Sequence, residues 1–343
     1  MISSLYLPGW QTINKKNNYQ FEYFQKKFNN IFVITKGEYG SINKEFKQNT
    51  KFNIIIENKI FKRIMIYIIF LLKDKSNNKI AIISPYGLTA IIFFLISKIF
   101  RLKIITVELG PIDFFSKKNI LERLFVYIIY KYSNLVWIKE PYMKKKLSFI
   151  NQEKIYLISN CVIPEKNLTK KNENIDFLWV NRFADSRTPE IIIDAMNLLI
   201  KKRNFFSVFL GDIQKQFLYL NNTNYIKVLS YQEPNEYYVN SKFFVCSGKR
   251  IFGNNALLES MNNGIIPIVN QSEDIDKIIK HGVNGFICDN NKESFFNILN
   301  YCLNLDNRET LILSKAAAKT IKLEFNNKIW NKKMDSFFKN INL

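Results

Sequence analysis

Two arginines stand where they can hold a phosphate group. Arg182 and Arg187 follow an apolar run that ends at Val180, and Thr188 with Pro189 then opens a helical pattern as its cap and first residue. Guanidinium groups beside a helix start suit a diphosphate, because each binds phosphate oxygens through paired N–H donors and neutralises the charge that develops when a phosphate leaves. The alternative is two surface arginines in weak ion pairs with neighbouring carboxylates.

A second loop leads into a helical pattern that carries Glu259. Gly248 and Gly253 flank a turn in this loop, and Asn254 or Asn255 is placed to cap the helix. Backbone N–H groups at a helix start bind phosphate, and a carboxylate at Glu259 can accept both hydroxyl protons of a ribose. The alternative for Glu259 is a solvated position on an amphipathic helix.

A third candidate, Glu108, ends an apolar run at residues 103–108 and lies near Gly110 and Asp113. Here a carboxylate can orient a hydroxyl group, or act as a base where its surroundings raise its pKa. The equal alternative is a strand-end glutamate that bonds to nearby backbone N–H groups.

Short β-branched runs alternate with helical patterns along the chain, which is typical of parallel βαβ units. Residues 159–175 lose the apolar period and gather Asn and Lys, as a linker does. The pattern predicts strands at 4–7, 31–35, 53–56, 80–84, 103–108, 135–138, 155–158, 177–180, 206–210, 226–229, 243–246 and 265–269, and later helices at 189–203, 255–261, 292–303, 308–325 and 328–340.

The fold class is therefore predicted as α/β, with two Rossmann-like doubly wound domains. Their expected bounds are 1–164 and 165–327, followed by a terminal helix within 328–343. In open parallel sheets ligands bind beyond the carboxyl ends of the strands. Two such sheets facing each other place the expected site in the cleft between them.

The charge of the chain indicates an anionic partner. Its 343 residues include 50 Lys and Arg against 29 Asp and Glu, a formal net charge of +21. Residues 1–164 hold 26 of the basic and 10 of the acidic side chains, so the partner is expected to contact the first half. The alternative is a Lys-rich surface that only solvates the protein. No nucleic-acid-binding motif is visible, and nucleic acid is not an expected partner.

Cysteine and histidine usage gives no sign of a disulfide framework or a metal site, since the four cysteines are far apart and the one histidine has no neighbouring ligands. The longest apolar runs, 64–72 and 88–96, have about half of the ~20 residues that a spanning helix needs. Helical stretches at 60–73 and 117–132 have basic edges, and most of their apolar residues are expected in the core. The candidates for contact with a membrane are Lys62, Arg63, Lys117 and Lys118.

The residues above resemble a known family. Residues 176–338 look like the nucleotide-sugar domain of the family 4 retaining glycosyltransferases, which have the GT-B fold. Asn181, Arg182 and Arg187 stand where that family has Gly, Arg and Lys. A later segment follows the family closely, and so does the turn at 281–288; the matching residues of the segment are Ser247, Asn255, Ala256, Leu257, Leu258, Glu259, Ser260, Met261, Gly264 and Pro267. In the first half, Gly9 remains from the family's Gly-Gly loop and Trp10 replaces the second glycine.

One family residue is missing. The family has two glutamates separated by seven residues, and the place of the first is taken by Ile251, after Lys249 and Arg250. In the family this glutamate holds the transferred sugar. A basic pair in its place suits an acidic donor sugar such as a uronic acid.

The resemblance implies a hexosyltransferase that moves a sugar from a UDP- or GDP-sugar to a cell-surface glycan or lipid-linked acceptor, with retention and without a metal or other cofactor. It implies donor binding by the second domain, acceptor binding by the first, and a location on the cytoplasmic, inner face of the cell membrane with its anionic lipids. The alternatives are a non-catalytic sugar-nucleotide-binding subunit, an inverting transferase and an epimerase. The catalytic candidates are Arg182, Arg187, Glu259 and Glu108, and the donor-binding candidates are Gly9, Asn181, Ser247, Gly253, Asn254, Asn255, Ala256 and Leu257.

Overall fold

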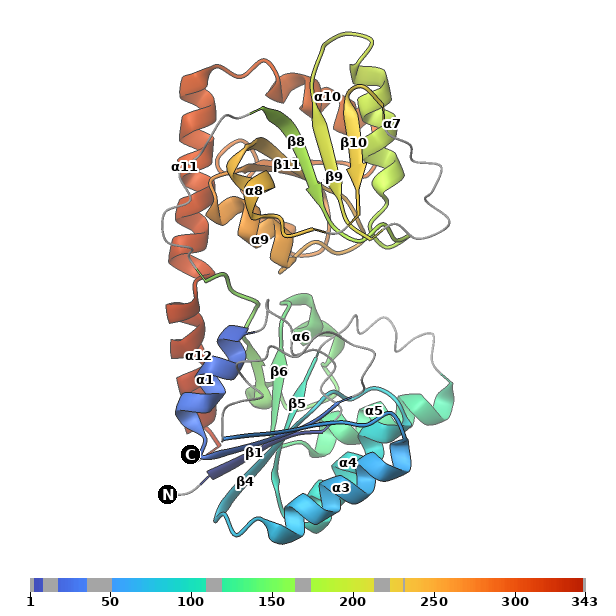
Figure 1. Cartoon of the computed structure of the whole chain (residues 1–343), viewed down its shortest axis with the longest axis vertical. Coiled ribbons are helices and arrows are strands. Elements are labelled where there is room, and N and C mark those ends of the chain that lie inside the picture. The colour runs from blue at the N-terminus through green and yellow to red at the C-terminus, as the bar shows by residue number, and fades with distance from the viewer. Residues whose placement is uncertain are drawn as a thin grey trace. The chain divides into compact units, whose positions relative to one another are not determined.

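The structure, a computed structural model, describes residues 3–8, 18–35, 51–108, 119–163, 174–212, 223–230 and 232–341. The chain divides into two compact units. The N-terminal unit comprises Met1–Ser159 with Asn331–Leu343, and the C-terminal unit comprises Asn160–Trp330. Each unit is an α/β layer structure built around one parallel sheet (Figure 1).

The described part of the N-terminal unit contains a seven-stranded sheet in the order β3-β2-β1-β4-β5-β6-β7. All neighbouring strands are parallel. Its strands are β1 (Ser3–Pro8), β2 (Asn30–Thr35), β3 (Phe52–Ile56), β4 (Asn78–Ile83), β5 (Lys103–Val107), β6 (Leu135–Ile138) and β7 (Ile155–Leu157), and its helices are α1 (Asn18–Lys27), α3 (Ile60–Lys73), α4 (Leu88–Ile99), α5 (Ile120–Tyr132) and α6 (Tyr142–Lys146).

The C-terminal unit repeats this architecture with six described strands in the order β10-β9-β8-β11-β12-β13, again all parallel. Its strands are β8 (Ile175–Val180), β9 (Ser207–Leu210), β10 (Ile226–Leu229), β11 (Ser241–Cys246), β12 (Ile266–Asn270) and β13 (Phe286–Cys288), and its helices are α7 (Pro189–Leu199), α8 (Asn235–Val239), α9 (Asn255–Asn262), α10 (Lys292–Cys302) and α11 (Asn307–Glu324). Helix α12 (Asn327–Lys339) begins in this unit and ends in the N-terminal unit.

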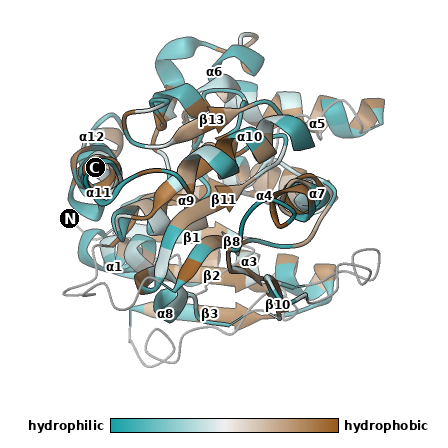
Figure 2. Ribbon diagram, turned by 90° about the horizontal axis from the view of Figure 1, so that it is seen from above, coloured by the Kyte–Doolittle hydropathy of each residue, from teal (hydrophilic) through white to brown (hydrophobic). Residues whose placement is uncertain are grey.

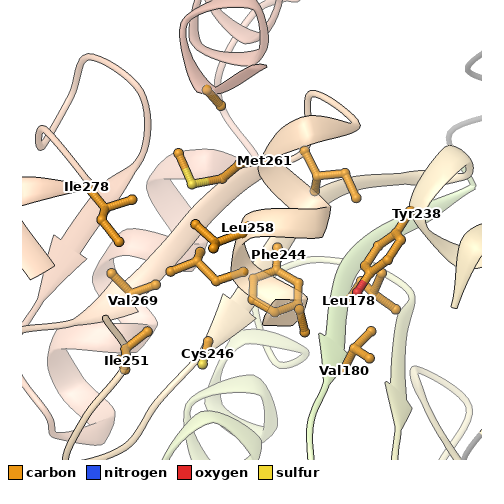
Figure 3. Packing of buried hydrophobic residues seen from close by; sticks show 14 of the residues in the cluster. Leu178, Val180, Tyr238, Phe244, Cys246, Ile251, Leu258, Met261, Val269 and Ile278 are labelled. Atoms are coloured by element: carbon orange, nitrogen blue, oxygen red, sulfur yellow. The ribbon is translucent and has the colours of Figure 1, made fainter. Parts of the chain in front are cut away.

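Apolar residues on both faces of each strand explain why the sheets are buried between helices. In the second sheet Trp179 packs with Phe209 on the face covered by α7 and α10. The adjacent Leu178 packs with Phe244 on the other face, against α9 and α11 (Figure 3). Figure 2 shows strands such as β2 and β11 as mostly hydrophobic. Each fully buried large side chain of this kind stabilises the fold by about 1.5–3 kcal/mol.

Capping residues account for several helix starts. Asp306 and Glu309 form a capping box at α11, in which each side chain accepts the backbone N–H of the other residue. Asn291 caps α10 and Pro189 occupies the first turn of α7. Helix α7 ends at Leu199 rather than at the predicted residue 203, and α6, α8 and β13, of five, five and three residues, are too short to show a period in the sequence.

The C-terminal part of α12 belongs to the N-terminal unit, where it packs on α1. The ring of Phe338 is fully buried and lies 5.4 Å from that of Phe28 and 6.1 Å from that of Tyr23. The Tyr23 hydroxyl donates a hydrogen bond of 2.7 Å to Asp335. Aromatic packing therefore ties the last helix to the first.

This packing predicts a stability effect. Phe338→Ala leaves a cavity between α12 and α1, so we expect the free energy of unfolding of the N-terminal unit to fall by about 3–5 kcal/mol. Phe61→Ala is the matched control, because the Phe61 side chain on α3 is 72% exposed. Denaturant unfolding followed by tyrosine and tryptophan fluorescence checks both variants. Equal effects of the two substitutions would contradict the packing role of Phe338.

Candidate functional site

The candidate site of the C-terminal unit lies at the point where the strand order reverses. Strand β8 pairs with β9 on one side and with β11 on the other. The carboxyl ends of β8 and β11 therefore lie side by side, and the chain leaves them in different directions. Such a switch point is where doubly wound sheets bind their ligands. It brings Asn181 next to Cys246 at the end of β11, and Arg187 next to Ser247 and Gly248.

Hydrogen bonds lock the loops after β8 and β11 together. The Ser247 hydroxyl donates to the backbone oxygen of Arg187 at 2.7 Å and to that of Thr188 at 2.9 Å. The Arg187 Nη1 donates to the backbone oxygen of Arg250 at 2.7 Å. Arg187 is half-buried, and this hydrogen bond from one nitrogen of its guanidinium holds the side chain in place. The side chain of Arg182 is exposed. Residues predicted from separate segments of the sequence form one structure.

The start of α7 differs from its prediction. Thr188 occupies the cap position in a left-handed conformation, but its hydroxyl makes no capping hydrogen bond. Its Oγ1 is buried and lacks a hydrogen-bond partner. The prediction that Thr188 caps this helix with its side chain is wrong, because the left-handed backbone turns that residue toward the loop after β11, where its carbonyl accepts from Ser247.

Gly248 is required by the close approach of the two loops. Its φ of +143° disfavours other residues, and a Cβ atom at this position would lie 2.6 Å from the backbone oxygen of Ser186. The backbone N–H of Lys249 donates to that same oxygen at 3.2 Å. A side chain at residue 248 would separate the loops and move both Arg187 and Ser247.

Asn270, at the carboxyl end of β12, holds the loop after β11 from its other side. The side chain is 2% exposed. Its Oδ1 accepts the Gly248 N–H at 2.8 Å, and its Nδ2 donates to the backbone oxygens of Gly248 at 3.1 Å and Gln271 at 2.8 Å. The sequence analysis missed this residue. A signal was available in the sequence, because Asn270 is a polar residue at the end of the apolar strand β12, which pairs with β11.

Helix α9 is capped by Asn254, whose Oδ1 accepts the backbone N–H groups of Ala256 at 2.9 Å and Leu257 at 3.3 Å. These are two of the N–H groups that the sequence assigned to a phosphate. The side chains of both residues are buried in the core. Because the Asn254 side chain already accepts from these N–H groups, they are not open to a ligand in this conformation. Asn255 is the remaining candidate at the helix start for contact with a phosphate.

Gly253, just before the cap, has a φ of +67° and open space around its Cβ position. Its backbone oxygen accepts from the Asn160 side chain at 2.9 Å. The chain therefore makes a left-handed turn into α9, and the space beside this turn is available to a bound group.

Glu259 is half-buried on α9, and its carboxylate is oriented by the neighbouring helix. The hydroxyl of Tyr238, on α8, donates to Glu259 Oε2 at 3.0 Å. Tyr238 is itself buried, so it holds the carboxylate in a defined direction. Glu259 is not the freely solvated glutamate of the alternative interpretation.

Ile251 is fully buried in the core cluster that includes Cys246 and Val269 (Figure 3). The residue in the place of the missing glutamate thus serves packing. Lys249 is exposed and Arg250 is half-buried beside it. Burial raises the pKa of the Cys246 thiol to about 11, although the nearby Arg187 opposes this shift.

In the N-terminal unit Glu108 is fully buried. Its Oε2 accepts hydrogen bonds from the hydroxyls of Tyr86, at 2.6 Å, and Tyr130. Burial, followed by the charge of Glu108, raises the pKa of both tyrosines well above the ordinary value. A carboxylate in this environment is not presented to solvent, and the half-buried Tyr86 is the outermost member of the cluster.

Several predicted residues lie outside the described residues, namely Gly9, Gly110, Asp113, Lys117 and Lys118. The described residues hold no cluster of three or more His, Cys, Asp and Glu side chains that could bind a metal ion. No helix within the described ranges is both long and apolar enough to cross a membrane.

The Asn270 contacts predict a measurable effect. Asn270→Ala leaves the buried N–H and C=O of Gly248 unpaired, and we expect the free energy of unfolding of the C-terminal unit to fall by about 1–3 kcal/mol. Asn270→Asp keeps an acceptor for the Gly248 N–H but sets a buried carboxylate oxygen against the backbone oxygens of Gly248 and Gln271, so a loss at least as large is expected. Denaturant unfolding of both variants is compared with that of Asn304→Ala, an exposed asparagine. A loss no larger than that of the control would show that Asn270 does not hold the loop.

The part of the chain that carries the candidate site is similar to a known protein family. Residues 162–320 match the model of the family described as glycosyl transferases group 1. This range contains both loops of the candidate site. No curated protein sequence matches the chain.

Solved structures similar to the whole chain have low sequence identity, and several of them are named as glycosyltransferases. HepE of Anabaena, solved in complex with UDP and glucose, has a TM-score of 0.80 and 13% identity, covering 99% of this chain and 100% of that one. A glycosyltransferase from Rickettsia africae has a TM-score of 0.78 and 16% identity, with coverage of 99% and 98%. WaaG, a glycosyltransferase involved in lipopolysaccharide biosynthesis, has a TM-score of 0.71 and 10% identity, with coverage of 98% and 99%.

The similarity over almost the whole chain gives the protein the GT-B fold. The family match adds the enzyme class through the domain that carries the candidate site. The protein is therefore a glycosyltransferase of the hexosyltransferase kind, and its residues 162–320 are similar to the glycosyl transferases group 1 family.

Proposed function

We propose that this glycosyltransferase moves a sugar from a nucleotide diphosphate carrier to a cell-surface glycan or a lipid-linked acceptor, with retention of configuration. The observation that supports the proposal is the pair of interlocked loops at the switch point of β8 and β11, in which Arg187 Nη1 donates to the backbone oxygen of Arg250 in the loop that leads into α9. A UDP-sugar is the first donor to test, because HepE binds UDP and glucose and was also solved with UDP-glucose. A GDP-sugar is the second.

In the proposed complex Glu259 accepts the ribose hydroxyls, since Tyr238 holds its carboxylate in one direction. The exposed guanidinium of Arg182 contacts the diphosphate with all of its nitrogens. Arg187, held by its hydrogen bond to Arg250, attracts the diphosphate with its positive charge. Backbone and side-chain groups of Asn181, Ser247, Gly253 and Asn255 complete the donor site. Residues 165–327 form the donor domain in this proposal and residues 1–164 the acceptor domain, with 328–343 as the terminal helix.

The proposed reaction breaks the bond between the anomeric carbon and the diphosphate oxygen, and forms a bond from that carbon to the acceptor oxygen. The proton of the acceptor hydroxyl passes to the departing phosphate oxygen. The two arginines stabilise the negative charge that grows on the diphosphate, which is the role otherwise given to a metal ion. Glu108 is too deeply buried to take this proton directly, and we propose that it positions Tyr86 on the acceptor side.

Lys249 and Arg250 favour a second class of donor. They lie beside Ile251, which is buried and has no polar group to offer a neutral sugar. Two cations at this point suit the carboxylate of a uronic acid. Uronic acid donors therefore belong in the same test as neutral donors, and a preference for neutral ones would exclude this choice.

A donor panel tests the proposed function. The purified protein is incubated with UDP-, GDP- and CMP-sugars, with and without lipid extract, and released nucleotide is measured. We expect release with one donor, reduced by about 10²–10³-fold in Arg182→Ala because transition-state charge is no longer neutralised. We expect a smaller loss in Glu259→Gln and none in Lys201→Ala, an exposed cation at the end of α7.

The other outcomes separate the alternatives. Nucleotide binding without release with any donor would indicate a non-catalytic binding subunit. Conversion of the donor sugar without an acceptor would indicate an epimerase, and an inverted anomeric product by NMR would indicate an inverting transferase. Unchanged turnover in both site variants would contradict the site assignment.

We also propose that the protein binds the cytoplasmic, inner face of a membrane through α3, α4 and α5, which contact one another along one face of the first sheet (Figure 1). The sequence analysis assigned most of their apolar residues to the core, and the structure instead leaves many of them exposed. These residues, here called the apolar surface, are Ile60, Phe61, Met65, Ile69, Leu72, Leu88, Leu95, Ile99, Ile120, Leu121, Leu124 and Tyr132. Exposed cations accompany them, including Lys62, Lys73, Lys98, Arg101, Arg123 and Lys131.

This surface predicts binding to anionic vesicles. Apolar residues enter the lipid interface, and each nearby Lys or Arg adds about 1 kcal/mol of attraction to anionic lipid. Cosedimentation with vesicles of equal parts phosphatidylcholine and phosphatidylglycerol measures the binding, which we expect to weaken with salt and in Leu95→Asp. Leu311→Asp, at a similarly exposed leucine of α11, is the control. Equal binding by the two variants would contradict the assignment of this surface.

A further inference from the structure

Arg63 is a buried cation with two side-chain nitrogens that lack hydrogen-bond partners among the described residues. The sequence analysis expected it at a membrane surface, but its side chain is 3% exposed, so that expectation is wrong. The buried Nε and Nη2 atoms have no hydrogen-bond partner within the part of the chain that the structure describes. A buried guanidinium without partners destabilises a fold, because the lost hydration is not replaced. Such a group implies that a partner is supplied from elsewhere.

The position of Arg63 explains where this partner would come from. Arg63 lies in the first turn of α3, on the same face as the buried Tyr67 and Leu71. The ring of Tyr67 contacts that of Tyr6 on β1, with centroids 5.8 Å apart, so this face of α3 is directed at the centre of the sheet. Helical side chains lean toward the start of their helix, which here directs the guanidinium toward the carboxyl edge of the strands.

This is the edge at which doubly wound parallel sheets bind their ligands. Strand β1 pairs with β2 on one side and with β4 on the other, so the strand order reverses there as it does at β8. The connection from β3 to α3 is fastened to the same edge, since Glu57 donates its backbone N–H to the oxygen of Thr35 at 2.9 Å. Arg63 thus lies close to the switch point of its own unit.

The surroundings of Arg63 favour an anion. The first turn of α3 contains no acidic residue, and the side chain of Lys59 makes no capping hydrogen bond. Lys59 and Lys62 are both exposed. The nearby carboxylate is that of Glu57, whose Oε1 accepts the Lys59 N–H at 2.9 Å and whose Oε2 lies 4.0 Å from Lys62 Nζ. Burial lowers the pKa of Arg63 and the charge of Glu57 partly opposes this.

We propose that Arg63 and the first turn of α3 form an oxyanion-binding site that takes a phosphate or carboxylate group of a substrate. The guanidinium offers a planar pair of donors that matches two oxygens of such a group. The positive end of the helix dipole adds to the attraction. The site itself is independent of the proposed function, and only the assignment of the anion to the acceptor or to the donor rests on that function.

Binding of inorganic phosphate tests the site without turnover. The thermal unfolding temperature is measured against phosphate concentration at constant ionic strength, in an Arg182→Ala background that weakens phosphate binding by the C-terminal unit. We expect phosphate to raise this temperature, and Arg63→Met to reduce phosphate affinity at least tenfold. We also expect Arg63→Met to unfold at a higher temperature than its parent without phosphate, since a buried unpaired charge is removed.

Lys73→Met is the matched control, because it removes an exposed cation from the last turn of the same helix. A phosphate response that persists in Arg63→Met, or that is lost equally in Lys73→Met, would overturn the proposal. If Arg63→Met does not fold, Arg63→Lys serves instead, since it keeps the charge and loses the paired donors. An unchanged phosphate affinity in Arg63→Lys would then overturn the proposal.

Steady-state kinetics assign the anion to a substrate. An acceptor phosphate or carboxylate at Arg63 predicts a raised KM for the acceptor in Arg63→Met, with the KM for the nucleotide sugar unchanged. A donor diphosphate predicts the reverse. Unchanged values of both constants and of kcat would overturn a role in substrate binding. These kinetics use variants made in the protein with Arg182 intact. Absence of turnover in that unsubstituted protein would refute the proposed function while leaving the phosphate result to decide the site.

Discussion

The parallel pairing of β8 with β11 is the contact on which the candidate donor site depends. Parallel strands end at one edge of a sheet, so loops far apart in the sequence meet there. Because β8 also pairs with β9, the loops after β8 and β11 separate and leave room between the start of α7 and the start of α9. The first sheet repeats this arrangement at β1, between β2 and β4.

Hydrogen bonds from side chains to backbone groups hold the two loops of the donor site in a single arrangement. Ser247 binds the carbonyls of the arginine loop, and Asn270 binds both polar groups of Gly248. These side chains can support catalysis without contacting a substrate, because they fix the positions of Arg187 and of the loop that leads into α9. Catalysis by charge stabilisation requires such preorganisation, since groups that must move to meet the developing charge stabilise it less.

The two units use charge in different ways. In the C-terminal unit Arg187 is partly satisfied by a backbone carbonyl, and Glu259 by a tyrosine. In the N-terminal unit Glu108 is satisfied by two tyrosines, whereas Arg63 is buried without a hydrogen-bond partner at two of its nitrogens. A buried charge with satisfied hydrogen bonds serves the fold, whereas an unsatisfied one destabilises it, and this difference motivates the proposed anion site at Arg63.

The sequence by itself determined the alternation of strands and helices, the doubly wound α/β class and a cap at Asn254 or Asn255, because these depend on local periodicity and on residues within one turn of each other. The tertiary structure decided what the side chains do. Whether Ile251 packs in the core, whether Glu108 meets solvent and whether Arg63 faces lipid depend on neighbours from other elements. The contact of Asn270 with Gly248 joins residues 22 positions apart, through the pairing of β11 with β12. Such contacts have no periodic signature, since only the register of the sheet brings the two residues together.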